Sequence, residues 1–447
     1  MSVIRTKPLI HSVAAIAIPV ALQSLLQSSF SMVDQIMAGQ LGSTSIAGIG
    51  IAGKFAFMYS TAIGAIAAIA GIMISQYEGQ GDRSSSDRSL CTTLGSVLLL
   101  GLLFTLVSLV APTRITSLYS SDEAAIEAAA IYLRILSGTY LPLGLTAILS
   151  VSLRCADDPQ APLWASVVSA LTNTGLNYLL IFGHFGFPQL GLQGAAIATV
   201  CGCLAGAGMT LGFFLRSLHR REVPFQFSLF ASQSEHLAYL RMLIPLLVTE
   251  LLWSLGQNVN TFIYGHISTY SLASVALISP VESLLIGLLS GIAQAAGILI
   301  GKRIGAEETK LAYQDSISLM WYGLAGALFL SVLLLPLRNL YTAIFNVEEE
   351  VKRTAAQLLL AFAVLAPFKV ENMIIGGGIL RSGGKTDIVM WIDLFGTWVL
   401  GVPLGLLSAR VFHLPVVTVY FIIGLEEVVR CIISIVMFHR KTWMTKL

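Results

Sequence analysis

The sequence is poor in charged residues, which make up only 11% of its 447 residues, whereas hydrophobic residues make up 55%. An ordinary soluble domain carries roughly 25% charged residues. The low charge therefore excludes a typical soluble protein and indicates a membrane protein. Long runs such as LGSVLLLGLLFTLVSLV, which starts at Leu94, are apolar on every face and lack the alternation of a membrane β-barrel. The spans are predicted to be α-helices.

Motifs of enzymes and of ATP-driven pumps are also missing. The five cysteines form no C-x-x-C pair and the seven histidines form no H-E-x-x-H pair, which disfavours a metal site. The run GILRSGGKT resembles a phosphate-binding loop, but that motif requires glycine where the chain has Ile379. The basic residues are spread over loops and are not clustered as in a nucleic-acid-binding protein. We therefore expect no enzyme, no cofactor and no nucleic-acid partner.

Apolar runs bounded by charged residues, glycine and proline predict an all-α integral membrane protein with twelve transmembrane helices. These spans are expected at 11–38, 45–75, 90–111, 126–152, 161–185, 191–215, 240–266, 270–301, 313–336, 352–380, 386–409 and 415–438.

The distribution of Lys and Arg over alternate connections predicts the orientation in the membrane. Seventeen of these residues lie on one side and five on the other, and the richer side is expected to face the cytoplasm. Both termini are then cytoplasmic, in a multi-pass protein of the bacterial cytoplasmic membrane. The five residues on the outer side are Arg114, Arg338, Lys352, Arg353 and Arg410.

The chain contains an internal repeat. When the sequence is shifted by 226 residues, positions 19–81 align without a gap and 15 of the 63 are identical, including Pro19 with Pro245 and Gly39 with Gly265. Six helices per half predict two lobes related by a pseudo-two-fold axis along the membrane normal, an arrangement typical of secondary transporters. We expect an N-terminal lobe at 1–217, a cytoplasmic linker at 218–238 and a C-terminal lobe at 239–447.

Asp34 is the most informative charged residue of the first half. It interrupts an apolar span, and a carboxyl partly removed from water favours its protonated form, so it can exchange a proton near neutral pH. Asn173 and Asn177 are four residues apart and share one helix face. They can ligate a monovalent cation or hydrogen-bond a protonated acid; interhelical hydrogen bonding is the alternative role.

The second half carries further acids within predicted spans. Glu250 and Asp393 are expected to meet inside the C-terminal lobe, as a second ion or substrate-cation site or as counter-charges for buried cations. Glu282 is a third such acid, for which a salt bridge with Lys54 is the structural alternative. Other charged residues that we predict inside the spans are Arg134, Lys369, Glu371, Glu426, Glu427 and Arg430, the last three expected to pair locally on one helix face.

Several stretches resemble the multidrug and toxic compound extrusion (MATE) family, and most closely its bacterial DinF-like branch. They are AGQLGSTSIAGIG after the first helix, NTGLNYLLIFG and GLQGAAIAT across the fifth and sixth, and GILRSGG and WVLGVPLG across the tenth and eleventh. The resemblance implies a secondary antiporter that exports organic, often cationic compounds in exchange for protons or sodium.

The resemblance also implies roles for individual residues. Asp34 stands at the place of the coupling acid, and Pro19 matches the proline at which the first helix bends upon protonation. Asn173, Asn177 and Thr199 match the remaining cation-site residues. Some family members carry an acid where Asn177 stands, so this chain favours proton coupling, with a sodium ion at Asp34, Asn173 and Asn177 as the alternative.

A lipid-linked saccharide flippase of the same superfamily is the second functional hypothesis. Such flippases line the central cavity with cations that hold a pyrophosphate, whereas here the interior cations are about balanced by acids and Asp34 would repel an anionic cargo. Antiport of a cation fits these charges better. The expected partners are hydrophobic or cationic small-molecule drugs and membrane lipid, and the expected oligomeric state is a monomer.

Overall fold

The computed structural model describes residues 8–221, 224–230, 232–345 and 347–447, and these residues form helices and connecting segments with no strand. The fold class is therefore all-α, as predicted. Arg5 and Lys7 of the orientation count, and residues 222, 223 and 231 of the predicted linker, lie outside the described residues. The helices of the first half are α1 (Leu9–Gly39), α2 (Ser43–Gln80), α3 (Arg83–Val110), α4 (Pro112–Ser117), α5 (Glu123–Leu136), η2 (Ser137–Thr139), α6 (Tyr140–Cys155), α7 (Gln160–Phe182), η3 (His184–Gly186) and α8 (Leu192–His219).

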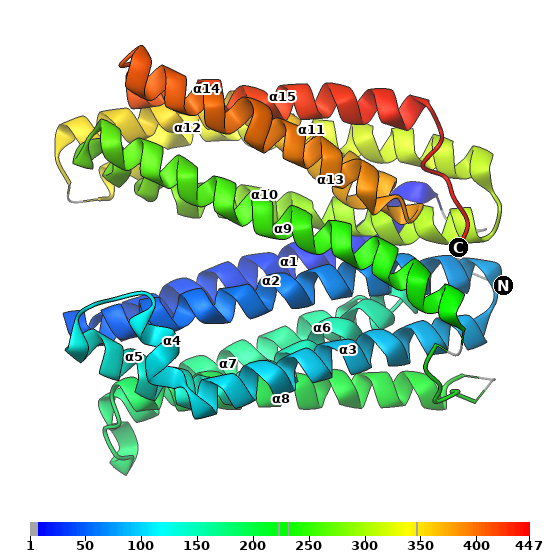
Figure 1. Cartoon of the computed structure of the whole chain (residues 1–447), viewed down its shortest axis with the longest axis horizontal. Helices are drawn as coiled ribbons and strands as arrows, with labels where there is room; N and C mark the ends of the chain where they lie inside the picture. Colours follow the sequence, from blue (N-terminus) through cyan, green and yellow to red (C-terminus); the bar gives the residue numbers. More distant parts are fainter. Residues whose placement is uncertain (1–7, 222–223, 231, 346) are drawn as a thin grey trace. The chain divides into compact units, whose positions relative to one another are not determined.

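The second half adds long helices that contain π-helical segments. Its elements are α9 (Gln233–Ile267), α10 (Thr269–Gly305), α11 (Thr309–Ala343), α12 (Glu349–Asn372), η4 (Met373–Leu380), α13 (Thr386–Leu394), η5 (Phe395–Gly401), α14 (Val402–Leu406), η6 (Leu407–Val411) and α15 (Val416–His439). The segments η4, η5 and η6 are π-helical. Figure 1 shows α12 and α15 as long helices lying side by side.

The internal repeat is visible in where the helices begin. The starts of α2 and α10, at Ser43 and Thr269, are 226 residues apart. The same separation holds for α3 and α11, for α5 and α12, and for α7 and α13. A shift derived from identical residues in 19–81 thus also describes where helices outside that range begin.

The chain forms two compact units. The second-half unit contains the described residues of Met1–Ala21, Ser75–Asp82 and Leu237–Leu447, and the first-half unit contains those of Leu22–Ile74 and Arg83–His236. The units therefore follow the two halves of the repeat, except that the start of α1 and the end of α2 join the second-half unit.

Close helix contact explains why the end of α2 belongs to the second-half unit. A methyl group added at Gly79 would overlap the carbonyl of Lys302, and one at Gly305 would overlap that of Gln76, so α2 and α10 touch backbone to backbone. The Gln76 side chain also donates hydrogen bonds to the carbonyls of Ser382 (2.7 Å) and Thr445 (3.1 Å).

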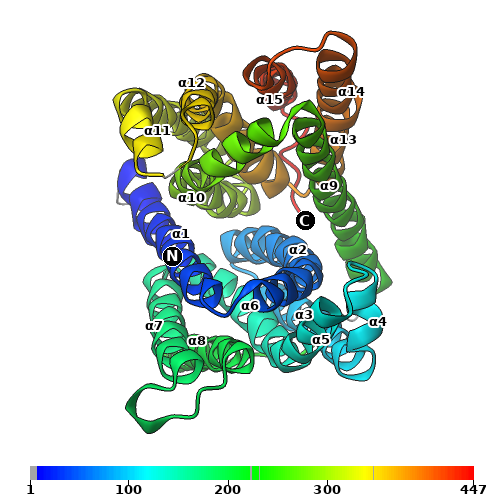
Figure 2. The same cartoon turned by 90° about the vertical axis from the view of Figure 1, so that its left-hand side faces the viewer.

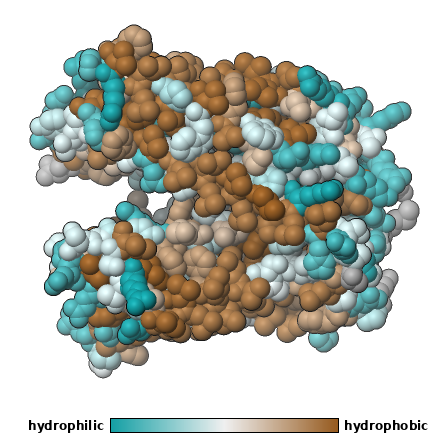
Figure 3. Space-filling view, viewed as in Figure 1, coloured by the Kyte–Doolittle hydropathy of each residue, from teal (hydrophilic) through white to brown (hydrophobic). Residues whose placement is uncertain are grey.

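Each unit exposes the apolar surface expected of a membrane protein. Hydrophobic side chains cover the middle of the helices and hydrophilic ones gather at the two ends (Figure 3). Eleven helical stretches of the described residues are long and apolar enough to cross a membrane. The twelfth predicted span coincides with α15, which has 24 residues but carries Glu426, Glu427 and Arg430. Inside the unit Arg430 pairs with Glu427, and Glu426 is buried.

Candidate functional site

The helices α7 and α8 pack closely in the first-half unit, and they lie side by side in Figures 1 and 2. Glycines make this contact possible. A methyl group at Gly202 of α8 would lie only 2.8 Å from Asn173 Cβ and 2.8 Å from the Ser169 carbonyl oxygen of α7. A similar close approach occurs at Gly194, opposite the Leu180 carbonyl. The contact holds polar side chains of the two helices within hydrogen-bonding distance.

A chain of hydrogen bonds connects the four residues that were predicted to bind the coupling ion. Asn177 Nδ2 donates to Asp34 Oδ1 at 2.7 Å and to Asn173 Oδ1 at 2.9 Å. Asn173 Nδ2 donates to Thr199 Oγ1 at 3.3 Å, and the Thr199 hydroxyl donates to the Ala195 carbonyl at 2.9 Å. The structure thus brings Asp34 of α1 together with residues of α7 and α8.

One buried acceptor within this group of hydrogen-bonded side chains has no partner among the described residues. Asn177 is only 3% exposed, and its Oδ1 atom is buried with no hydrogen-bond partner among the described residues. Asp34 is partly exposed, so its carboxylate remains accessible. An unpaired buried acceptor is costly, and a proton carried by the neighbouring carboxyl or a bound cation would satisfy it.

The residues fit a proton or a single hard cation better than a structural metal ion. Their side-chain donors are one carboxylate, two carboxamide oxygens and one hydroxyl, and oxygen ligands of this kind suit hard cations. Within the described residues no three His, Cys, Asp or Glu side chains gather as a metal site. Of the four side chains, only the Asp34 carboxyl can gain or lose a proton near neutral pH, because carboxamides and hydroxyls keep their protons there.

Pro19 lies within α1, which runs as one helix from Leu9 to Gly39. It is buried, and two residues earlier the Ala17 carbonyl lies against Gly291 of α10, where a methyl group would overlap it. Proline cannot donate the hydrogen bond to the residue four positions earlier, which weakens a helix at that point. The structure places Pro19 where α1 can bend, and its role in bending stays a prediction.

Glu250 and Asp393 gather around a cation in the second-half unit. Arg381 Nη1 lies 4.0 Å from Glu250 Oε1, and Arg381 Nη2 lies 3.8 Å from Asp393 Oδ2. The other oxygen of Asp393 pairs with Arg430. The two acids, expected to meet inside the C-terminal lobe, thus share Arg381 as a partner, a contact that the sequence did not predict.

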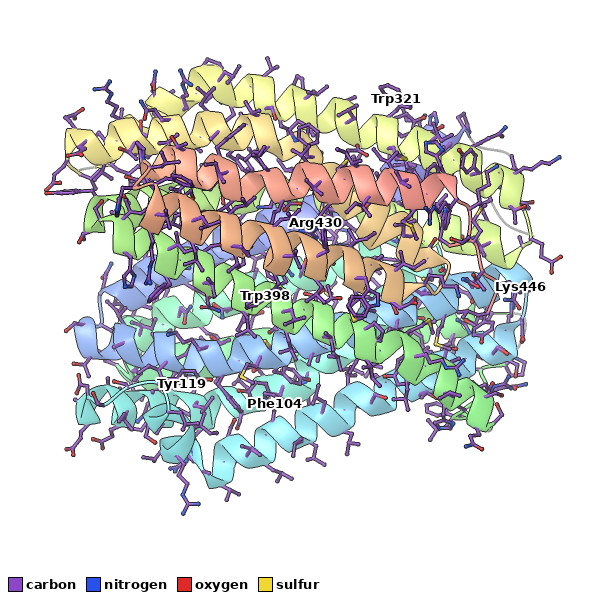
Figure 4. All side chains as sticks on the ribbon, turned by 45° about the horizontal axis from the view of Figure 1, so that its top comes forward. Phe104, Tyr119, Trp321, Trp398, Arg430 and Lys446 are labelled. Carbon is purple, nitrogen blue, oxygen red and sulfur yellow. The ribbon has the colours of Figure 1, made fainter. Side chains whose placement is uncertain are left out.

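Charged residues of α15 extend this group. Arg430, labelled in Figure 4, pairs with Glu427 at 3.4 Å, which confirms the local pairing predicted for these two residues. Asn372 Nδ2 donates to the Glu427 carboxylate at 2.8 Å and to its carbonyl at 2.7 Å. The third member of the predicted set, Glu426, differs, because its Oε2 atom is buried without a partner among the described residues.

The π-helical segment η5 provides the space for these side chains. A methyl group at Gly396 would overlap the Arg430 side chain, and one at Gly401 would overlap the Glu426 carboxylate. Short π-helical segments are frequently found at functional sites. Here it coincides with glycines that allow α15 to approach.

Three further charged residues were predicted inside the spans. Glu282 accepts a hydrogen bond from the Tyr420 hydroxyl of its own unit. Lys54 and Arg134 lie within helical stretches long and apolar enough to span a membrane, as predicted, and their side chains are exposed on the first-half unit.

Glu371 is the acid that sequence reasoning undervalued. It is 7% exposed, and its Oε1 atom has no hydrogen-bond partner among the described residues. It directly precedes Asn372 and the π-helical segment η4. An acid inside an apolar span, one turn before the run GGG at 376–378, was the available signal.

Replacing Gly202 with Ala tests the contact that holds the Asp34 site together. The added methyl group pushes against Asn173, so we expect slower ethidium export and destabilisation by roughly 1–3 kcal/mol. The matched control is Gly208→Ala on the same helix, where no atom lies within 4 Å of the added methyl group. Equal transport rates and unfolding free energies for the two variants would contradict the predicted role of the contact.

Comparison with known proteins places the chain among membrane transporters. The MatE family model matches residues 19–179 and 245–407, one match in each half of the repeat. The probable multidrug resistance protein NorM of Rhizobium meliloti is 29% identical over 416 residues, covering 90% of this chain and 86% of that protein. The probable multidrug resistance protein NorM of Thermotoga maritima is 24% identical over 439 residues, covering 96% and 92%.

Solved structures show the same fold. A multidrug resistance MATE family transporter of the MOP superfamily, in an outward-facing conformation, matches with a TM-score of 0.88 at 17% identity, covering 97% of this chain and 96% of that one. A MATE structure in complex with MaL6 matches with a TM-score of 0.87 at 18% identity and the same coverage.

Proposed function

This chain belongs to the MatE family of membrane transporters, and on that premise we propose that it is a secondary antiporter that exports organic, often cationic compounds in exchange for inward protons. It is a transporter and not an enzyme. Two relatives are named as probable multidrug resistance proteins, and these names support a broad range of substrates for this chain. Sodium is the alternative coupling ion, and membership of the DinF-like branch stays a prediction.

The observation that carries the proposal is the hydrogen-bonded chain from Asp34 through Asn177 and Asn173 to Thr199. It contains one group that can gain or lose a charge, held in a fixed orientation by an amide donor. An ionisable group within a membrane-spanning helix costs free energy, and such groups usually mark ion or substrate pathways.

The proposed cycle follows from the charge of Asp34. In the anionic form the carboxylate attracts a cationic compound and accepts the Asn177 amide hydrogen bond. Uptake of a proton neutralises the carboxyl and removes that attraction, so the compound is released to the outside. The new hydroxyl can donate to the open Asn177 Oδ1 once the amide turns. Bending of α1 at Pro19 would accompany this change.

The second-half acids receive a different role in this proposal. Glu250 and Asp393 flank Arg381, and Asp393 also pairs with Arg430, so they act as counter-charges that hold α9, α13 and α15 together. Glu282 is anchored by the Tyr420 hydroxyl. We therefore assign coupling to Asp34 and not to these three acids.

The remaining parts of the proposal concern location and partners. We propose that the protein works as a monomer in the bacterial cytoplasmic membrane with both termini in the cytoplasm. Its small-molecule substrates are hydrophobic or cationic drugs, and it requires no cofactor besides the coupling ion.

Ethidium uptake into inside-out membrane vesicles tests the function, with the proton gradient and the sodium gradient imposed separately. We expect ethidium to accumulate when the lumen is more acidic than the outside. A difference of one pH unit is worth about 1.4 kcal/mol per proton, which sustains roughly a tenfold ethidium gradient for one-for-one exchange. Vesicles without the protein are the control. Accumulation driven by sodium alone would reassign the coupling ion, and accumulation under neither gradient would reject antiport.

A further inference from the structure

A cavity of about 570 Å³ lies between the end of α11 and the beginning of α12 in the second-half unit. In Figure 1 the end of α11 and the beginning of α12, drawn in yellow, lie at the end of this unit away from the C-terminus. Its polar lining consists of Arg338, Asn339, Thr342, Glu349, Lys352, Arg353 and Gln357. We call it the α11–α12 pocket.

The repeat provides a counterpart of this pocket in the first-half unit. A cavity of about 460 Å³ lies between α4 and α5, and each of its eight lining residues has a partner 226 positions later that lines the α11–α12 pocket. Thr113 corresponds to Asn339 in this way, and Glu123 to Glu349. The shape of the pocket therefore comes with the repeated fold and does not depend on the charges that line it.

The two pockets have opposite charge. In the α4–α5 pocket the charged residues are Glu123, Glu127 and Arg134. In the α11–α12 pocket Glu127 is replaced by Arg353 and Ile126 by Lys352, and Arg338 is added, so three cations face one carboxylate. The same cavity thus carries a net negative charge in one half of the chain and a net positive charge in the other.

The cations of the α11–α12 pocket are only partly neutralised. Lys352 pairs with Glu349 at 2.8 Å, but the Glu349 side chain is 88% exposed whereas that of Lys352 is 22% exposed. Arg338 and Arg353 have no ion-pair partner in the described part of the chain, and the Nε atom of Arg338 is buried without a hydrogen-bond partner there. Two guanidinium groups with free donors fit the oxygens of a phosphate, which arginine binds with two parallel hydrogen bonds.

The surroundings of the pocket are those of a lipid-facing surface. The pocket lies at the ends of helices that are apolar enough to span the membrane, and Leu340, Ile344 and Leu360 expose apolar side chains beside it. Three of the five cations predicted on the outer side of the membrane gather here, although that side is generally poor in Lys and Arg. A phosphate attached to acyl chains satisfies both the cations and the apolar rim.

We propose that the α11–α12 pocket binds the phosphate of an anionic phospholipid, with Arg338, Lys352 and Arg353 around the headgroup and the acyl chains along α11 and α12. Basic pockets between transmembrane helices bind phospholipid headgroups by this combination of charge and apolar contact. The chemistry that the cations recognise is shared with free phosphate, and the apolar rim favours the lipid. The site is separate from the Asp34 site and does not depend on the proposed antiport.

Native mass spectrometry of the purified, delipidated protein tests the proposal with three probes: phosphatidylglycerol, phosphatidylcholine with the same acyl chains, and sodium phosphate. We expect phosphatidylglycerol to be retained in preference to the other two. Each of the variants Arg353→Gln and Arg338→Gln is expected to weaken its binding by about fivefold, because one positive charge near an anionic lipid contributes about 1 kcal/mol. The matched control is Arg134→Gln, the cation of the equivalent pocket, which should bind as wild type.

Three results would overturn the proposal. The first is wild-type retention of phosphatidylglycerol by both arginine variants, and the second is an equal loss in Arg134→Gln. The third is binding of sodium phosphate as strong as that of phosphatidylglycerol, which would assign the site to a free anion. Thermal unfolding without lipid checks folding, and if Arg338→Gln fails this check, Arg353→Gln carries the test because Arg353 is exposed.

Discussion

Replacing Asp34 with Asn is expected to abolish proton-driven accumulation of ethidium in inside-out vesicles. The amide has nearly the shape of the carboxyl and can remain hydrogen-bonded to Asn177, but it cannot take up a proton. Uncoupled from the proton gradient, the variant should only equilibrate ethidium across the membrane. The roughly tenfold gradient expected for the wild type at one pH unit would fall to the level of vesicles without the protein.

The matched control for this variant is Asp122→Asn in the same unit. Asp122 caps α5 by accepting the Ala124 N–H at 3.0 Å, and asparagine caps helices equally well, so transport should be unchanged. Ethidium binding to the purified Asp34 variant shows whether it is folded. If the folded variant accumulates ethidium under a pH gradient as the wild type does, Asp34 is not the coupling residue.

Replacing Arg430 with Met is expected to destabilise the second-half unit by roughly 3–5 kcal/mol, the usual cost of removing one partner of a buried ion pair. The guanidinium pairs with both Asp393 and Glu427 and lies against Gly396 of η5. Without it two carboxylates remain in a low-dielectric interior with reduced compensation. The measurement is the free energy of unfolding from a denaturing-detergent titration in mixed micelles.

Two further variants separate lost charge balance from lost packing. Arg410→Met removes an exposed cation that lies 5.6 Å from the Phe262 ring, and we expect a change within about 0.5 kcal/mol. Adding Asp393→Asn and Glu427→Gln to Arg430→Met neutralises the orphaned acids and should recover most of the stability. A loss no larger for Arg430→Met than for Arg410→Met would show that the ion pairs contribute little.

The spans and the repeat could be predicted from the sequence because their signals are local. A run of about 20 apolar residues has few stable conformations in a bilayer other than a helix. The start of α12 at Glu349 and that of α5 at Glu123 obey the 226-residue shift found in 19–81. The α15 helix shows the limit of composition, since it coincides with a predicted span although it carries three charged residues.

The candidate site was predictable only in part. The spacing of Asn173 and Asn177 on one helix is a local property, and their hydrogen bond of 2.9 Å follows from it. The bond from Asn177 to Asp34 joins residues 143 positions apart, and family resemblance rather than helix geometry indicated it. The place of Arg381 between Glu250 and Asp393 had no such signal, because the contacts of a long side chain depend on which helices pack around it.

The order of residues alone determined the membrane class and the helical spans. It also determined the two halves and the short list of intramembrane charges. Those properties rest on composition and on short-range periodicity. Which acids are neutralised and which stay open was decided by helix packing, as the contrast between Asp393, paired with two arginines, and Glu371, with an unpartnered oxygen, makes clear. The reason is that the cost of a buried charge depends on the few ångströms around it, and those neighbours come from distant parts of the chain.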